Sequence, residues 1–110
     1  MLDKPEKTAE LIAALKAALP FEASLTPELI ADLARHEKPL AVNSTQTVAD
    51  ISYAGDEGGI VCHITLAADG HTIYASLTHV RVSRTLPFAM AVIEYQKHRV
   101  KKLKRINGRI

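Results

Sequence analysis

The spacing of apolar residues changes twice along this chain, and this change constrains the fold more than any other feature. In residues 1–40, and again in residues 86–107, apolar side chains recur every three or four positions, which is the period of an amphipathic helix. Between residues 47 and 83 they alternate with other side chains at a period of two, which is typical of strands. The sequence therefore predicts an α+β protein with the order ααβββα.

The first forty residues are predicted to form a helical hairpin. The first helix carries an apolar stripe through Leu11, Leu15 and Leu19, and Pro20 ends it. A second helix begins at Thr26, whose side chain is a good N-cap, with Pro27 in the first helical position. We expect both stripes to pack on the core.

Residues 47–83 are predicted to form a three-stranded antiparallel meander, with the helices packed on one face. The glycine-rich stretch 55–59 separates the first two strands, and Asp69-Gly70 is predicted to form a two-residue hairpin turn. The third strand is expected to run from Thr72 to Ser83, with a change of phase at His79 that suggests a bulge. A fold of this kind places every strand beside its neighbour in the sequence.

The predicted turns also predict which residues face one another across the strands. In the first hairpin Tyr53 pairs with Ile60, Ile51 with Cys62 and Ala49 with Ile64. In the second, Leu66 pairs with Ile73, Ile64 with Ala75, and Cys62 with Leu77. Both registers place large apolar residues on one face, so Cys62 is expected to be buried and chemically inert.

On the opposite face the same registers align Asp50, His63 and Ser76 across three strands. A carboxylate, an imidazole and a hydroxyl are the groups that a hydrolase triad uses. Side chains on an open sheet face stand roughly parallel, and the sequence shows neither a nucleophile elbow nor an oxyanion hole. We therefore interpret this polar row as a solvated sheet face and keep hydrolysis as a third hypothesis.

Charge is distributed very unevenly along the chain. Residues 1–80 hold five Lys and Arg against eleven Asp and Glu, a charge of −6. Residues 81–110 hold nine Lys and Arg against Glu94 alone, a charge of +8, and the two parts add up to the net charge of +2. An asymmetry of this kind favours a polyanionic partner, an acidic protein surface or association between copies.

The predicted helix over residues 86–107 carries most of this positive charge. Its apolar side is expected to run through Ala89, Ile93, Val100 and Leu103, so that the basic residues face solvent. Lysine and arginine bind phosphates and release counterions, and an aromatic ring beside them can stack on an unpaired base. The candidate polyanion-binding residues are Tyr95, Lys97, Arg99, Lys101, Lys102, Lys104 and Arg105.

From these observations we expect a small non-enzymatic binding domain, with nucleic acid as its first candidate partner. The alternative is a protein-interaction domain or a homo-oligomeric subunit that uses the same helix, with an acidic protein as a possible partner. A chain of 110 residues forms one domain, and no cofactor or metal site is expected. The single cysteine, the charged first residues and the lack of a long apolar run predict a cytoplasmic protein that does not enter a membrane.

Overall fold

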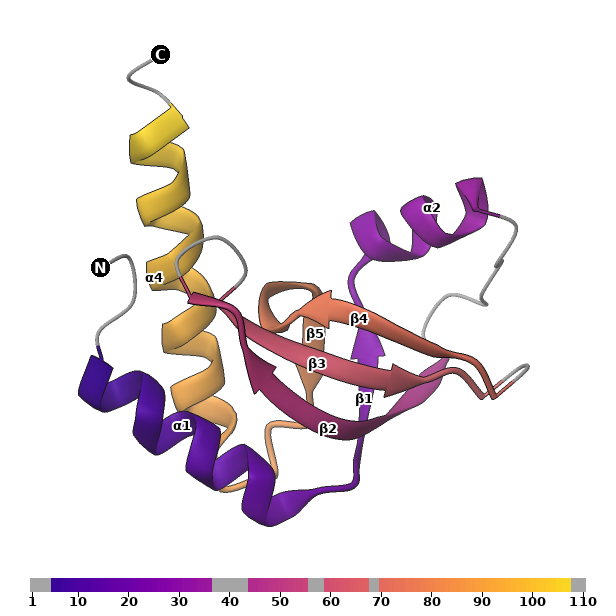
Figure 1. Cartoon of the computed structure of the whole chain (residues 1–110), viewed down its shortest axis with the longest axis horizontal. Coiled ribbons are helices and arrows are strands. Elements are labelled where there is room, and N and C mark those ends of the chain that lie inside the picture. Colours follow the sequence, from indigo (N-terminus) through magenta and orange to yellow (C-terminus); the bar gives the residue numbers. More distant parts are fainter. Residues whose placement is uncertain (1–4, 37–43, 56–58, 68–69, 108–110) are drawn as a thin grey trace.

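The chain forms a mixed structure of helices and one antiparallel sheet, so the α+β class is confirmed (Figure 1). The computed structural model describes residues 5–36, 44–55, 59–67 and 70–107, and it describes the side chains of the last helix as far as Lys102. The sheet has five strands in the order β4-β3-β2-β1-β5, so the predicted three-stranded sheet is wrong. The elements are α1 (Pro5–Ala18), β1 (Phe21–Leu25), α2 (Pro27–Arg35), β2 (Thr45–Tyr53), β3 (Ile60–Thr65), β4 (Thr72–Ser76), the 3₁₀ helix η1 (Leu77–His79), β5 (Val80–Val82) and α4 (Ala89–Asn107).

Strand β1 lies between the two helices that were predicted to form a hairpin. Phe21, Ala23 and Leu25 are buried, whereas Glu22 is exposed and Ser24 is half-buried, which is the alternation of a strand. The partners of β1 are β2 and β5, both distant in the sequence. The strand therefore separates α2 from α1, and the two helices lie at opposite ends of the sheet (Figure 1).

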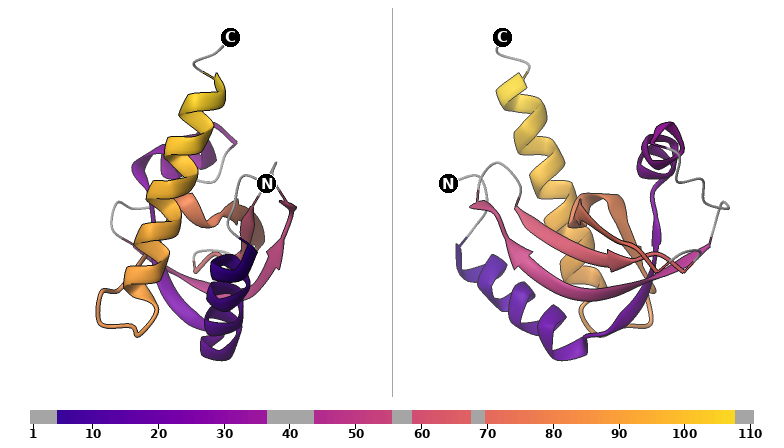
Figure 2. Two further views of the ribbon diagram at one scale, coloured as in Figure 1. Left: turned by 90° about the vertical axis from the view of Figure 1, so that its left-hand side faces the viewer. Right: turned by 45° about the vertical axis from the view of Figure 1, so that its right-hand side comes forward.

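The predicted third strand is broken into two strands that lie at opposite edges of the sheet. After β4 the chain turns through η1, where the Ser76 hydroxyl accepts a hydrogen bond from the Thr78 backbone N–H at 3.2 Å. The chain then continues as β5, in which Val80 pairs with Leu25 of β1. The phase change at His79 therefore marks a 3₁₀ turn, not the predicted bulge. Because three residues join the two edges, the sheet must curve strongly, and Figure 2 shows this curvature.

Strand β2 is long enough to serve both halves of the sheet. Thr45–Val48 pair with β1 on one side, and Thr47–Tyr53 pair with β3 on the other, where the register shifts between Val48 and Asp50. This irregularity leaves Ala49 unpaired, so Val48 and not Ala49 faces Ile64. An irregularity of this type bends a strand. In Figure 1, β1 and β5 accordingly run up and down the view, whereas β2, β3 and β4 run across it.

The register of β3 against β4 differs from the prediction by two residues. Ile64 pairs with Ile73 and Cys62 with Ala75. The connection is longer than a two-residue turn, because the Leu66 N–H donates to the His71 carbonyl at 2.8 Å and the Gly70 N–H donates to the Leu66 carbonyl at 2.8 Å. Asp69, the other predicted turn residue, lies outside the described residues. A shift of two residues keeps every side chain on its predicted face, so the core face of both strands is confirmed.

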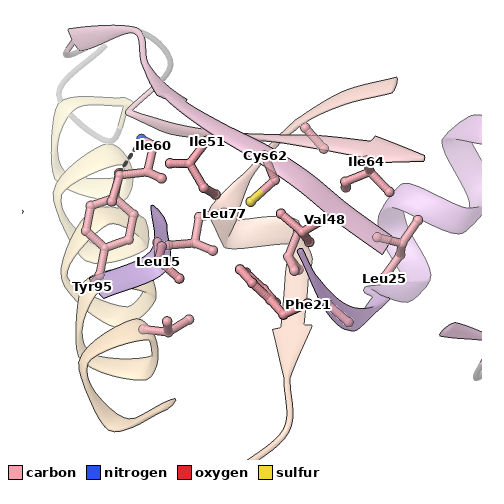
Figure 3. Packing of buried hydrophobic residues seen from close by; sticks show 14 of the residues in the cluster. Leu15, Phe21, Leu25, Val48, Ile51, Ile60, Cys62, Ile64, Leu77 and Tyr95 are labelled. Atoms are coloured by element: carbon pink, nitrogen blue, oxygen red, sulfur yellow. Dashed lines mark hydrogen bonds between the residues drawn. The ribbon is translucent and has the colours of Figure 1, made fainter. Parts of the chain in front are cut away.

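The core lies on the inner side of the curved sheet, where α1 and α4 cover it (Figures 2 and 3). Leu15 of α1 and Val92 of α4 are almost completely buried against the sheet. The rings of Phe21 and Phe88 pack at a centroid distance of 5.3 Å. Cys62 is fully buried at the centre of this cluster, as predicted.

Helix α4 presents a different side to the core from the one predicted. Its buried residues include Ala89, Val92, Tyr95 and Arg99, whereas Val100 is 41% exposed. Tyr95 and Arg99, two long side chains with polar groups, are therefore buried at positions that the apolar pattern assigned to the surface. The side chain of Leu103 lies outside the described part of the helix.

Candidate functional site

Two of the predicted polyanion-binding residues, Tyr95 and Arg99, point into the protein. Tyr95 is 8% exposed, and its hydroxyl accepts a hydrogen bond from the backbone N–H of Ile60 at 2.9 Å (Figure 3). Arg99 lies one turn further along α4 and is 2% exposed. A buried ring cannot stack on a base, and a buried guanidinium cannot reach a phosphate. We therefore exclude both residues from the candidate site.

Both side chains pack against Gly59, at the start of β3. Gly59 has a φ of +62°, and a Cβ atom at this position would overlap the Tyr95 hydroxyl and lie 2.7 Å from Cζ of Arg99. Glycine is thus required here both for its backbone conformation and for the close approach of α4. The sequence shows Gly59 only as one glycine of a turn, so this contact could not be found from the local pattern.

A second anchor holds the middle of α4 against the sheet edge. The Gln96 side-chain amide donates to the carbonyl of Leu77 at 2.8 Å and to the carbonyl of Val80 at 2.6 Å. Leu77 begins η1 and Val80 begins β5, so Gln96 joins α4 to both ends of the short connection from β4 to β5. Tyr95, Gln96 and Arg99 together fix the first ten or so residues of α4 to the body of the protein.

Exposed basic side chains begin at Lys97, on the outer side of α4, and continue where the helix extends past the sheet. Lys97 and Lys101 are exposed and stand one turn apart, and His98 and Lys102 are half-buried. Neither Lys97 nor Lys101 forms an ion pair with an acidic group among the residues that the structure describes. The backbone helix continues to Asn107, and Figures 1 and 2 show its last turns extending past the sheet. The side chains of Lys104 and Arg105 lie outside the described part. We refer to residues 97–107 as the basic end of α4.

The polar row predicted on the outer face of the sheet is only partly present. Asp50 faces His63, as the register predicted, but Ser76 faces Val61. The Ser76 hydroxyl instead lies 2.9 Å from that of Thr78. The Asp50 carboxylate accepts a hydrogen bond from the Ile51 N–H at 2.8 Å.

Besides Asp50, His63 lies beside Ser52 and Tyr74, which the sequence analysis did not include in the polar row. His63 Nε2 lies 2.9 Å from the hydroxyl of Ser52, and its ring packs edge-on against Tyr74 at a centroid distance of 4.8 Å. These are cross-strand contacts on an exposed face, where such pairs stabilise a sheet by a few tenths of a kcal/mol. The predicted order of carboxylate, imidazole and Ser76 hydroxyl is not formed, because the β3–β4 register places Tyr74 where Ser76 was expected.

Cys62 is buried, and it does not gather with acidic residues in the part of the chain that the structure describes. Burial raises the pKa of the Cys62 thiol to about 12, which disfavours the thiolate needed for nucleophilic attack. Its inertness toward reagents stays a prediction. Among the described residues there is no group of three or more His, Cys, Asp or Glu side chains that could hold a metal ion.

The described helices contain no segment that is long and apolar enough to cross a bilayer. Comparison of the chain with protein-family models gave no match, and comparison with curated proteins and with solved structures gave no significant match.

Proposed function

We propose that this protein is a small non-enzymatic domain that binds nucleic acid through the basic end of α4. The observation that carries the proposal is the change in surroundings at Arg99. Up to this residue one side of α4 is packed on the body while Lys97 is exposed on the other side, and beyond it the helix extends past the sheet while its basic residues continue. A helix about 10–12 Å wide that carries positive charge and extends past the sheet is accessible to a phosphate backbone.

The chemistry of this end favours contacts with phosphates over recognition of bases. Lysine is a flexible point charge, and the exposed pair Lys97 and Lys101 can follow successive phosphates without a fixed geometry. The one aromatic residue of the predicted site, Tyr95, is buried, so base stacking at this helix is no longer part of the proposal. We therefore expect binding that depends strongly on salt and weakly on base sequence.

The rest of the molecule adds few cations to this surface. Residues 1–80 carry a charge of −6, which repels a polyanion from the body and directs it toward the basic end of α4. The protein is proposed to act in the cytoplasm, where its single buried cysteine needs no disulfide partner.

The test is binding of a labelled oligonucleotide by fluorescence anisotropy, measured at several salt concentrations. The variant Lys97→Gln/Lys101→Gln removes two exposed charges from the basic end while retaining good helix formers. We expect its affinity at low salt to fall by about tenfold, and the slope of log affinity against log salt to become shallower by roughly 1.5.

The matched control is Lys16→Gln/Arg84→Gln. It removes the same two charges from exposed positions on α1 and after β5, so the net charge of both variants is identical. The control should bind almost as tightly as the wild type. Equal losses in both variants would show a response to net charge alone. No binding by the wild type at low salt would contradict the proposal and favour an acidic protein as the partner.

A further inference from the structure

A large apolar groove separates the two helices that cover the core. It has a volume of about 850 Å³ and lies between α1 and the first half of α4, and Leu86 and Pro87 are also on its lining. Much of its wall consists of small side chains, namely Ala14, Ala17, Ala18 and Ala91. Ala14, Ala17 and Ala91 are exposed to solvent. Because these alanines do not fill the space between the helices, the core residues Leu11 and Phe88, which are 5% and 6% exposed, form part of the groove lining.

A long apolar side chain stands at the edge of this groove. Met90 is 67% exposed, and it lies directly before Ala91 and one turn before Glu94, which both line the groove. Methionine is flexible and adapts its shape to irregular apolar surfaces. One region of the molecule thus carries both an apolar cavity and an apolar side chain that protrudes.

The charged residues around the groove are of both signs. Lys7 lies on its lining together with Glu10 and Glu94. The two carboxylates disfavour a nucleic acid or an anionic lipid as the occupant. A set of mixed sign suits a partner surface that also carries both signs.

These properties are the ones that an interface between identical copies requires. In a two-fold pairing a surface meets itself, so a patch of one sign would repel its copy, and a protrusion needs a cavity on the same surface. The groove, Met90 and the mixed charges meet both conditions within one surface. We propose that the α1–α4 groove is a homodimer interface in which Met90 of each copy enters the groove of the other copy. This inference does not depend on nucleic-acid binding.

The first experiment is the mass of the protein in solution, measured by sedimentation velocity without nucleic acid over micromolar to submillimolar concentrations. We expect the wild type to reach about 24 kDa, twice the 12.0 kDa of one chain. Ala14→Glu places a carboxylate in the groove, and Met90→Lys replaces the protruding side chain with a charge. Each variant should weaken dimerisation at least tenfold.

Tyr74→Lys is the matched control for Met90→Lys. Tyr74 is 68% exposed, similar to Met90, but it lies on the outer face of the sheet and does not line the groove. This variant should dimerise like the wild type. Because Ala14, Met90 and Tyr74 are all exposed, the variants should fold. Circular dichroism and thermal unfolding test this expectation.

A second experiment tests the geometry directly by disulfide formation between two different variants. Protein carrying Met90→Cys and a mass tag is mixed with protein carrying Ala14→Cys under mild oxidation. The proposal predicts a cross-linked product that contains one copy of each variant. The native thiol should not take part, because Cys62 is completely buried.

Three outcomes would overturn the proposal. The first is a wild type that stays at 12.0 kDa at the highest concentration. The second is a dimer that both groove variants leave intact, which would place the interface elsewhere. The third is a mixed sample in which the two variants fail to cross-link, although the wild type is a dimer.

Discussion

The two ends of α4 are parts of one continuous helix, yet different forces determine what each end does. From Ala89 to Arg99 the helix is held by packing and by hydrogen bonds to the turn after β4 and to the start of β3. Beyond Arg99 the helix extends past the sheet and its described residues are exposed or half-buried. The comparison shows that the side of the helix on which a basic residue lies and its distance from the sheet, and not its type, decide whether it stabilises the fold or is available to a partner.

The largest effect is expected at Gly59, where the anchored end of α4 meets β3. Gly59→Ala forces a side chain into the Tyr95 hydroxyl and the Arg99 guanidinium at a positive φ, so we expect a loss of about 3 kcal/mol in the free energy of unfolding. Gly55→Ala is the control, because φ is +70° there but nothing lies within 4 Å of the new methyl group. It should cost about 1 kcal/mol. Urea unfolding measures both, and equal losses would contradict the close contact.

The next prediction compares two basic residues that are two positions apart. Arg99→Gln shortens a buried, charged side chain and removes its guanidinium donors, so it should cost about 2–3 kcal/mol of unfolding free energy. Lys101→Gln changes an exposed side chain on the projecting end and should stay within about 0.5 kcal/mol of the wild type. Similar losses of unfolding free energy in the two variants would contradict the difference between the anchored and the projecting end of the helix.

Two valines of α4 test which side of the helix faces the core. Val92→Ala deletes two methyl groups at a position that is 1% exposed, so we expect a loss of about 2 kcal/mol. Val100, which the apolar pattern places in the core, is 41% exposed, and Val100→Ala should cost less than about 1 kcal/mol. The reverse order in thermal or urea unfolding would support the helix orientation predicted from the sequence.

The smallest effect concerns a single hydroxyl. Tyr95→Phe removes the acceptor of the Ile60 N–H and leaves that buried donor unsatisfied, at a cost of about 1 kcal/mol. Tyr74→Phe removes an exposed hydroxyl from the outer sheet face and should be nearly neutral. Hydrogen exchange at Ile60 provides a local check, because its amide should exchange faster in Tyr95→Phe alone.

The sequence predicted the parts of the fold that depend on local patterns. In α1 the predicted stripe is confirmed at Leu11 and Leu15, whereas Leu19 lies just after the helix. The Thr26 cap of α2 is confirmed, because its hydroxyl accepts a hydrogen bond from the Leu29 N–H at 3.4 Å. The predicted pairing of Ile51 with Cys62 is also confirmed. It was predictable because the period of the strands and the short separation of β2 from β3 in the sequence determine it. These features depend on residues that are close in the sequence, where periodicity and capping leave few alternatives.

Three features could not be predicted because their causes lie far apart in the chain. Strand β1 is only five residues long and gains its partners from β2 and β5. The break between β4 and β5 depends on the curvature that lets one chain reach both edges of the sheet. In the candidate site, Tyr95 and Arg99 look like surface residues until Gly59 is brought against them.

The amino-acid sequence alone thus determined the α+β class, the burial of Cys62 and the concentration of positive charge in the last thirty residues. The tertiary structure alone decided which of those charges face outward and where an apolar groove remains open. The physical reason is that hydrophobic periodicity records the average polarity of each side of a helix. A buried tyrosine or arginine is stabilised instead by particular partners in another element, such as the Ile60 N–H for Tyr95, and no local pattern contains them.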